Sequence, residues 1–494
     1  MKPLVLLVAT AIPLLAADCA TLANLKLPAT TITSAQTIAP GAFTPPTPGR
    51  GPNPFAPLPA FCRVAATLTP SADSDIKIEV WLPESNWNGK FEAVGNGGWA
   101  GTITYPALAT ALARGYATAS TDTGHATPGG AFALGHPEKL VDFGYRAVHE
   151  MTVQAKALIA AYYGNQAKRS YWNGCSTGGR QGLMSAQRYP SDFDGIVAGA
   201  PANYMSHLQP WSLWVPMAVH QTEASYIPPA KYPIIHKAVL EACDALDGVR
   251  DGVLEDPTRC HFDPKTLECQ GSETSNCLTA PQVEAARKIY SPMTNPRTGL
   301  QLFPALEPGS EVGWTGLAGP QPMAIPVDTF KYMVHNNPNW DWKTIDFDKD
   351  VAATEKLFAP IIDAVNADLT PFFSRGGKLL MYHGWNDQLI APRNSIQYFD
   401  NVRYTLGTAK TLDGMRLYMV PGMAHCNGGD GTGTFDVVGN LERWVEQGQA
   451  PDTIIASRTN PNRTRPLCQW PKVAVWSGTG STDDVANFSC KIQP

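Results

Sequence analysis

The chain has 494 residues, of which 44% are hydrophobic, 16% charged and 9% aromatic. This composition is enough for a large core, and the length fits two or three units or one elaborated domain. The 38 Lys and Arg residues against 43 Asp and Glu give a net charge of −5. Because no excess of positive charge is available to neutralise phosphates, we expect no nucleic-acid partner.

The N-terminus has the layout of a secretory signal peptide. A positive charge at Lys2 precedes a short apolar stretch that ends in the small residues Ala16 and Ala17. The stretch is shorter than the roughly 20 apolar residues of a membrane span, and Asp18 interrupts it. Asp18 also occupies the position where a lipid anchor on Cys19 would require a small residue. We expect cleavage near Ala16 or Ala17, a secreted or periplasmic protein and no membrane partner.

Ten cysteines, an even number in an exported chain, predict disulfides rather than free thiols. A zinc site would need Cys-x-x-Cys or clustered Cys and His, and the sequence contains neither. Short intervals make Cys243/Cys260, Cys269/Cys277 and Cys468/Cys490 natural local pairs, and the other pairings stay open. The ten are Cys19, Cys62, Cys175, Cys243, Cys260, Cys269, Cys277, Cys426, Cys468 and Cys490.

Short apolar runs that end in Gly-rich or polar turns are typical of strands buried on both faces of a parallel sheet. Residues 140–163, between two of these runs, carry apolar side chains at nearly helical spacing and predict a crossover helix. The sequence therefore predicts the α/β class with a mostly parallel sheet. The runs are residues 91–94, 115–119, 170–173, 195–199, 378–382 and 416–420.

The pattern changes after residue 202. Residues 204–373 are rich in Pro, Trp and Cys and contain helical stretches at 231–242 and 281–290, with no comparable strand run. We interpret this segment as a lid domain inserted into one core domain. The predicted organisation is a signal peptide at 1–17, the first part of the core at 18–203, the lid at 204–373 and the second part of the core at 374–494.

A nucleophile is predicted at Ser176, within the motif Gly174-Cys175-Ser176-Thr177-Gly178 between a predicted strand and a predicted helix. In a Gly-x-Ser-x-Gly elbow the tight turn requires small neighbours and exposes the serine oxygen. The following helix N-terminus favours a developing anion. The alternative interpretation is an ordinary Gly-rich turn.

The base and the orienting acid should follow in the order Ser, Asp, His. Asp387 comes just after the predicted strand at 378–382, and His425 just after the one at 416–420. We therefore predict a Ser176–Asp387–His425 triad. The competing residues are Asp400 and Asp413 for the acid and His383 for the base.

The oxyanion hole of such an elbow uses the backbone N–H after the nucleophile and a second N–H from an early strand-end loop. Thr177 is the first donor by position. Gly97 and Gly98 are both candidates for the second, with Gly98 preferred. The alternative for these glycines is a plain turn.

The Cys-Ser, Asp and His-Cys residues resemble the pattern of the tannase and feruloyl esterase family, which also includes the esterase that acts on mono(2-hydroxyethyl) terephthalate. Residues 174–201 are a close match, and the resemblance extends from about Cys19 to Cys490. It implies an α/β-hydrolase core with a large lid, and a disulfide between Cys175 and Cys426. It also implies a structural calcium ion in the lid.

The segment 244–253 agrees with a calcium site. Asp244, Asp247 and Asp251 supply carboxylates at short intervals, and glycines permit a tight wrap. Backbone carbonyls of Val249 and Val253 would complete an oxygen-rich shell. The alternative is an acidic surface turn, and no organic cofactor is expected.

These features predict a secreted serine esterase that cleaves aromatic or phenolic esters through an acyl-enzyme on Ser176. The expected partner is a small aromatic ester derived from plant cell walls or polyphenols. The alternatives are a tannase, a mono(2-hydroxyethyl) terephthalate hydrolase, a peptidase, or an inactive hydrolase-fold binding module, against which the complete triad argues.

The lid composition bears on the acyl group. Residues 298–374 contain ten aromatic side chains and no arginine. We expect most of these aromatics in the core, so that only a few can line the pocket. A terephthalate carboxylate would favour a bidentate guanidinium, for which lysine is a poorer planar partner. The composition therefore favours neutral phenolic acyl groups, although Arg297, Arg375 or Arg393 could reach the site from outside this segment.

Overall fold

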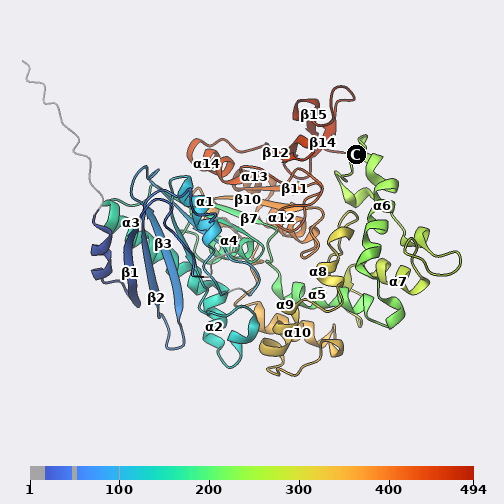
Figure 1. The fold of residues 1–494 in the computed structure, drawn as a ribbon, viewed down its shortest axis with the longest axis horizontal. Helices are drawn as coiled ribbons and strands as arrows, with labels where there is room; N and C mark the ends of the chain where they lie inside the picture. Colours follow the sequence, from blue (N-terminus) through green and yellow to red (C-terminus); the bar gives the residue numbers. More distant parts are fainter. Residues whose placement is uncertain (1–16, 47–52, 100, 494) are drawn as a thin grey trace, which may run out of the picture.

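The computed structural model describes residues 17–46, 53–99 and 101–493, so all of the predicted signal peptide except Ala17 lies outside the described residues. A nine-stranded sheet forms the centre of the molecule (Figure 1). In sheet order its strands are β1 (Thr30–Ile38), β2 (Phe61–Leu68), β3 (Ile76–Pro83), β5 (Ala117–Thr121), β4 (Lys90–Val94), β6 (Arg169–Cys175), β7 (Gly195–Gly199), β10 (Lys378–Gly384) and β11 (Met415–Val420).

The sheet confirms the predicted α/β class. Strands β5, β4, β6, β7, β10 and β11 run parallel. They contain five of the six apolar runs in full and residues 117–119 of the run 115–119. Strands β1, β2, β3 and β5 pair antiparallel and extend the sheet at one edge. The apolar-run criterion missed β1 to β3. Strand β1 is an edge strand with partly exposed side chains, and β2 alternates between fully and partly buried positions. Strand β3 is buried except at Lys77, but the charged Lys77 and Glu79 interrupt its apolar residues.

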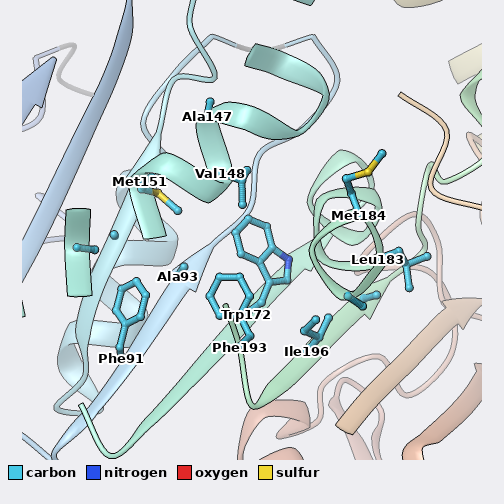
Figure 2. Close-up of a cluster of buried hydrophobic side chains, with 14 of the residues drawn as sticks. Phe91, Ala93, Ala147, Val148, Met151, Trp172, Leu183, Met184, Phe193 and Ile196 are labelled. Carbon is cyan, nitrogen blue, oxygen red and sulfur yellow. The ribbon is translucent and has the colours of Figure 1, made fainter. Parts of the chain in front are cut away.

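Helices cover both faces of the sheet. On one face α3 (Ala147–Tyr163) packs on β3 and β5, and α4 (Thr177–Arg188) packs on β6 and β7. The fully buried Trp172 of β6 lies among the buried side chains on this face (Figure 2). On the other face lie α1 (Tyr105–Ala113) and α14 (Val437–Gln447). Burial on both faces is the reason that these strands read as continuous apolar runs.

The chain leaves the sheet after β7 and returns at β10. The intervening segment, green to orange in Figure 1, is mostly helical and has its own buried cluster around Trp211 and Trp314. No helix in the described part of the chain is both long and apolar enough to span a bilayer. The elements of the segment are α5 (Met205–Val219), α6 (Tyr232–Cys243), α7 (Ala280–Ile289), β8 (Met293–Thr294), β9 (Gln301–Phe303), α8 (Thr315–Ala318), α9 (Ala324–Asp328), α10 (Lys349–Phe358) and α11 (Thr370–Phe373).

Beyond the sheet, two small ribbons end the chain. The ribbon of β12 (Thr453–Thr459) and β13 (Asn462–Cys468) lies near β11, and Figure 1 places that of β14 (Val473–Trp476) and β15 (Phe488–Lys491) on the side toward α6. Arg463 and Arg465 of one ribbon contact Asp251 of the inserted segment. The remaining elements are α2 (Pro137–Val141), α12 (Arg393–Leu406) and α13 (Thr408–Gly414).

All ten cysteines form disulfides. The three local pairs predicted from their spacing are present, and so is the pair implied by the family resemblance. Cys19 pairs with Cys62, which joins the N-terminal segment to β2. The bonds are Cys19–Cys62, Cys175–Cys426, Cys243–Cys260, Cys269–Cys277 and Cys468–Cys490.

Candidate active site

Ser176 lies in the sharp turn between β6 and α4, with φ 63° and ψ −123°. A non-glycine residue in this region costs on the order of 1–3 kcal/mol, which the surrounding structure must offset. The turn depends on Gly174, where a Cβ would lie 2.6 Å from the carbonyl carbon of Gly178. The Gly178 N–H donates to Asn96 O at 2.8 Å, which ties the elbow to the loop after β4.

Asp387 and His425 form a hydrogen-bonded pair at the ends of β10 and β11. Oδ2 of the fully buried Asp387 accepts from Nδ1 of His425 at 2.7 Å. Its Oδ1 accepts the N–H groups of Leu389 and Ile390 at 2.8 and 2.9 Å. The carboxylate is therefore fixed from both sides, with one oxygen aimed at the imidazole.

The competing acids do not meet this histidine. Asp400 pairs with Arg403, and Asp413 lies near Lys378. His383 does contact Asp387, through Nε2 to the same Oδ2 that His425 contacts. The structure therefore brings Asp387 together with both histidines that the sequence offered.

The pair is electrostatically matched. Burial raises the pKa of Asp387, but the charge of His425 and hydrogen bonds from both histidines outweigh it and hold the pKa below its usual range. Burial lowers the pKa of His425, and the charge and hydrogen bond of Asp387 reverse this, so that the pKa lies above its ordinary value. A carboxylate that stays ionised beside a basic imidazole is the arrangement that a serine nucleophile requires.

A disulfide joins the two loops. Cys175 and Cys426 are bonded with their Cα atoms 5.9 Å apart, and each is adjacent to a predicted triad residue. Cys426 itself has φ 66°, the left-handed region. Ser176 and His425 line the same pocket. The bond therefore fixes the nucleophile loop against the base loop.

The predicted oxyanion donors lie together at this pocket. The Thr177 hydroxyl donates to Gly98 O at 3.0 Å, and Trp99 Nε1 donates to the carbonyl of Ile325 in the inserted segment at 3.2 Å. Neither Thr177 N–H nor Gly98 N–H donates to another backbone carbonyl among the described residues. Gly97 also lines the pocket, so both candidates for the second donor stay open.

The pocket at Ser176 has a volume of about 360 Å³ and is mostly apolar. Apart from the triad and the predicted oxyanion residues, its polar lining side chains are Gln209 and Ser212 on α5. Among its described lining residues the only ionisable side chain is that of His425. The other lining residues are Gly97, Gly98, Cys175, Ser176, Thr177, Ala202, Met205, Leu208, Met323, Ile325, Pro326, Leu389, Ile390 and Cys426.

Most of the ten lid aromatics are core residues, as expected, and the few that could have lined this pocket do not. None of the ten is among the described lining residues, because many of them form the inserted segment's own core, as Trp314 and Phe330 do. The three arginines are also engaged elsewhere. Arg297 pairs with Asp348 and Arg393 with Glu307. Arg375 donates to backbone carbonyls after α4.

A family model described as tannase and feruloyl esterase matches residues 62–491. The chain belongs to this family. An uncharacterised esterase of Xanthomonas campestris is 40% identical over 97% of this chain and 92% of its own length. A probable feruloyl esterase B-2 of Aspergillus terreus is 38% identical over 87% of this chain and 86% of its own.

Solved structures agree with this family. Feruloyl esterase B from Aspergillus oryzae superposes with a TM-score of 0.89 at 33% identity, covering 96% of this chain and 99% of that one. Tannin acyl hydrolase from Aspergillus niger shares the fold, with a TM-score of 0.80 at 24% identity, covering 97% and 95%. The protein is a carboxylic ester hydrolase of the α/β-hydrolase fold.

Four of the five predicted calcium residues, Asp247, Val249, Asp251 and Val253, line a cavity of about 20 Å³, and Asp244 is not among its described lining residues. The charged side chains Glu255, Arg463 and Arg465 also line it. This volume is sufficient for one water-sized occupant. Burial, together with the charges of the two neighbouring aspartates, raises the pKa of Asp247 to about 6. The carboxylates fit a hard cation, whereas Arg463 and Arg465 already place positive charge beside the cavity.

The side chains also have protein partners. Asp244 accepts the N–H of Gly252 at 3.1 Å, and Asp251 pairs with Arg463 and Arg465 at 3.0 and 2.6 Å. Within the described ranges no three acidic, histidine or cysteine side chains are arranged as a formed metal site. Calcium binding therefore stays a prediction.

Sequence reasoning missed three polar contributors to the site. Gln388 Oε1 accepts the backbone N–H of His425 at 3.2 Å. The position of Gln388 directly after Asp387 in the sequence could have indicated this contact. Gln209 and Ser212 are contributed by the inserted segment, where no motif marks them. They lie near Ser176 only because the folded chain places α5 in the wall of the same pocket.

Proposed function

We propose that this esterase hydrolyses esters of neutral aromatic acids through an acyl-enzyme on Ser176. His425 takes the Ser176 proton as the oxygen attacks the ester carbonyl, and then gives it to the leaving alcohol. Asp387 holds the imidazole in the Nδ1–H tautomer and stabilises its charged form. The N–H groups of Thr177 and Gly98 stabilise the tetrahedral anion. Water, activated by His425, releases the acid.

The observation that carries the proposal is the chemistry of the pocket wall. An apolar cavity of this size suits a substituted phenyl ring. Gln209 and Ser212 are buried and uncharged, and they suit hydroxyl or methoxy oxygens on that ring. An acyl carboxylate such as that of terephthalate would be buried without a cationic partner, which is costly. The printed names of the feruloyl esterase relatives support a ferulate-like acyl group.

We expect methyl ferulate and methyl caffeate to be hydrolysed with a higher kcat/KM than mono(2-hydroxyethyl) terephthalate, measured by product chromatography. Methyl gallate tests the tannase alternative. A higher kcat/KM for methyl gallate than for methyl ferulate would indicate a tannase. The Gln209→Leu variant should lower the preference for caffeate over methyl cinnamate, which lacks ring oxygens. A preference for the terephthalate ester would overturn the proposal.

We also propose that the protein is exported and meets its ester outside the cytoplasm, among plant cell-wall or polyphenol derivatives. Five disulfides support export, because they persist in oxidising compartments. The N-terminal signal pattern supports it further. N-terminal sequencing of the mature protein, which should begin near Asp18, tests this.

The calcium proposal is structural. A cation between Asp244, Asp247 and Asp251 would neutralise crowded carboxylates, with carbonyls of Val249 and Val253 as further ligands. No catalytic step involves this turn. We expect about one calcium per chain by metal analysis, because five oxygen ligands and a one-ion cavity suit a single cation.

We expect EDTA to lower the melting temperature of the wild-type protein, because metal binding free energy is linked to folding. Asp247→Asn should lower it as well and remove the EDTA response. Asp251→Ala is a poor test, since it also breaks two arginine pairs. Asp263→Asn, an exposed aspartate paired with Arg287, is the matched control and should keep the EDTA response. Native protein without calcium would contradict the proposal.

A further inference from the structure

His383 is completely buried at the end of β10, where it contacts the predicted triad. Its Nε2 lies 3.0 Å from Asp387 Oδ2 and 3.1 Å from the carbonyl oxygen of Ile390. Its Nδ1 lies 2.8 Å from Ser395 Oγ on α12. Because Nε2 faces only acceptors, it carries the hydrogen and donates to Asp387.

Asp387 is thereby shared between two imidazoles. Its Oδ2 accepts from His425 at 2.7 Å and from His383 at 3.0 Å, while Oδ1 takes the two backbone N–H groups. A buried histidine with a purely structural role needs only hydrogen-bond partners for its ring nitrogens, whichever groups supply them. Here the partner is the carboxylate that orients the predicted base, so the contact bears on the reaction.

We propose that His383 is a positioning residue for ester hydrolysis, whose Nε2–H fixes Asp387 and takes up part of its negative charge. The proposal rests on the triad assigned above. His383 does not touch the ester. It sets the orientation of the carboxylate, and therefore the strength with which that carboxylate attracts His425.

Other charged groups near this strand are engaged elsewhere. The elements packed on β10 are β7, β11, α12 and α14, and β7 has no ionisable side chain. The charged groups on the others have their own polar contacts. They are Arg416 with the carbonyls of Leu412 and Met415, Arg393 with Glu307, Asp400 with Arg403, Glu442 and Glu446 with Lys90, and Arg443 with Asn440. Lys378 at the start of β10 contacts Asp413, and the phenols of Tyr382 on β10, Tyr398 and Tyr404 on α12 and Tyr418 on β11 complete the set.

Two substitutions separate the contacts of the ring. The amide of His383→Gln reaches the Nε2 position and keeps a donor to Asp387. The shorter amide of His383→Asn reaches the Nδ1 position, keeps a partner for Ser395 and loses the donor to Asp387. Both variants place a polar amide in the same buried site, so each is the other's control for stability.

We expect His383→Asn to lower kcat about 10- to 100-fold with little change in KM, because a misplaced catalytic group costs about this much. The acid limb of kcat/KM reports deprotonation of the base in the free enzyme. Without the His383 donor, the full charge of Asp387 acts on His425 and raises its pKa further. The acid limb should therefore move to higher pH in His383→Asn and stay at the wild-type position in His383→Gln.

An acid limb that does not move, or that moves to lower pH, in folded His383→Asn would reject the positioning role. If His383→Asn does not fold, Ser395→Ala decides, because it releases one anchor of the ring, and the limb should move upward by a smaller amount. Ser176→Ala is assayed alongside. Hydrolysis that survives in Ser176→Ala refutes the triad itself. If Ser176→Ala is inactive but the acid limb of His383→Asn does not move, only the role of His383 is refuted.

Discussion

Replacing Ser176 by alanine is expected to reduce ester hydrolysis by about 10⁴-fold or more and to leave the fold unchanged. The reaction needs a nucleophilic oxygen at the elbow, and alanine supplies none. Alanine has the same Cβ as serine, so the backbone strain at φ 63° is unchanged and the melting temperature should be close to that of the wild type. Turnover of a chromogenic short-chain ester measures the effect.

Ser185→Ala is the matched control. Ser185 lies on α4, the helix that starts just after Ser176, and its hydroxyl donates to Gln181 O within that helix. Its loss should leave kcat and KM near the wild-type values. Wild-type activity in Ser176→Ala would reject the nucleophile, whereas a similar loss in both variants would indicate damage to the helix instead of the chemistry.

The parallel part of the sheet could be predicted because burial on both faces leaves a simple pattern in the sequence. Strands β7, β10 and β11 are buried along most of their length, and β6 is buried over its central residues 170–172. The antiparallel strands β1 to β3 were missed because polar or charged residues interrupt their apolar side chains, even in β3, where every position except Lys77 is buried. A search for alternating residues in 61–68 would have found β2, whose burial also alternates.

Each predicted triad residue could be located because it follows a predicted strand, and the ends of parallel strands meet at one edge of a sheet. The two-histidine contact of Asp387 could not be predicted. It depends on the turn after β10 bringing His383 back onto the carboxylate four residues later. The sequence offered His383 and His425 as rivals for one role, whereas the structure gives each a separate contact.

The pocket wall was least predictable because it comes from the inserted segment. Helix α5 supplies Gln209 and Ser212, and the α9 region supplies Ile325. These residues are close to Ser176 only through long-range packing. Composition did indicate that residues 298–374 supply no arginine to the pocket, and none is among its described lining residues. That statement concerns residue types only. It could not show which aromatics face the pocket, which is a question of geometry.

The Cys175→Ala/Cys426→Ala variant is expected to lose kcat more than substrate affinity. The bond closes a loop of 251 residues between the nucleophile and the base. In the chain-entropy model a cross-link of this length stabilises the folded state by about 5 kcal/mol, although measured effects are often smaller. The variant should lose kcat before it loses stability. Ser176 and His425 follow separate strands, and proton transfer needs the serine oxygen and the imidazole within hydrogen-bond distance.

Cys269→Ala/Cys277→Ala is the control for loss of a disulfide as such. That bond closes a loop of only 8 residues in the inserted segment, with neither cysteine at the pocket. It should lower the melting temperature slightly and leave kcat unchanged. Single-turnover kinetics on both double variants, at a temperature where both are folded, separates acylation from binding. If the Cys175/Cys426 variant acylates at the wild-type rate, or if mass spectrometry finds both thiols free in the native protein, the disulfide does not position the triad.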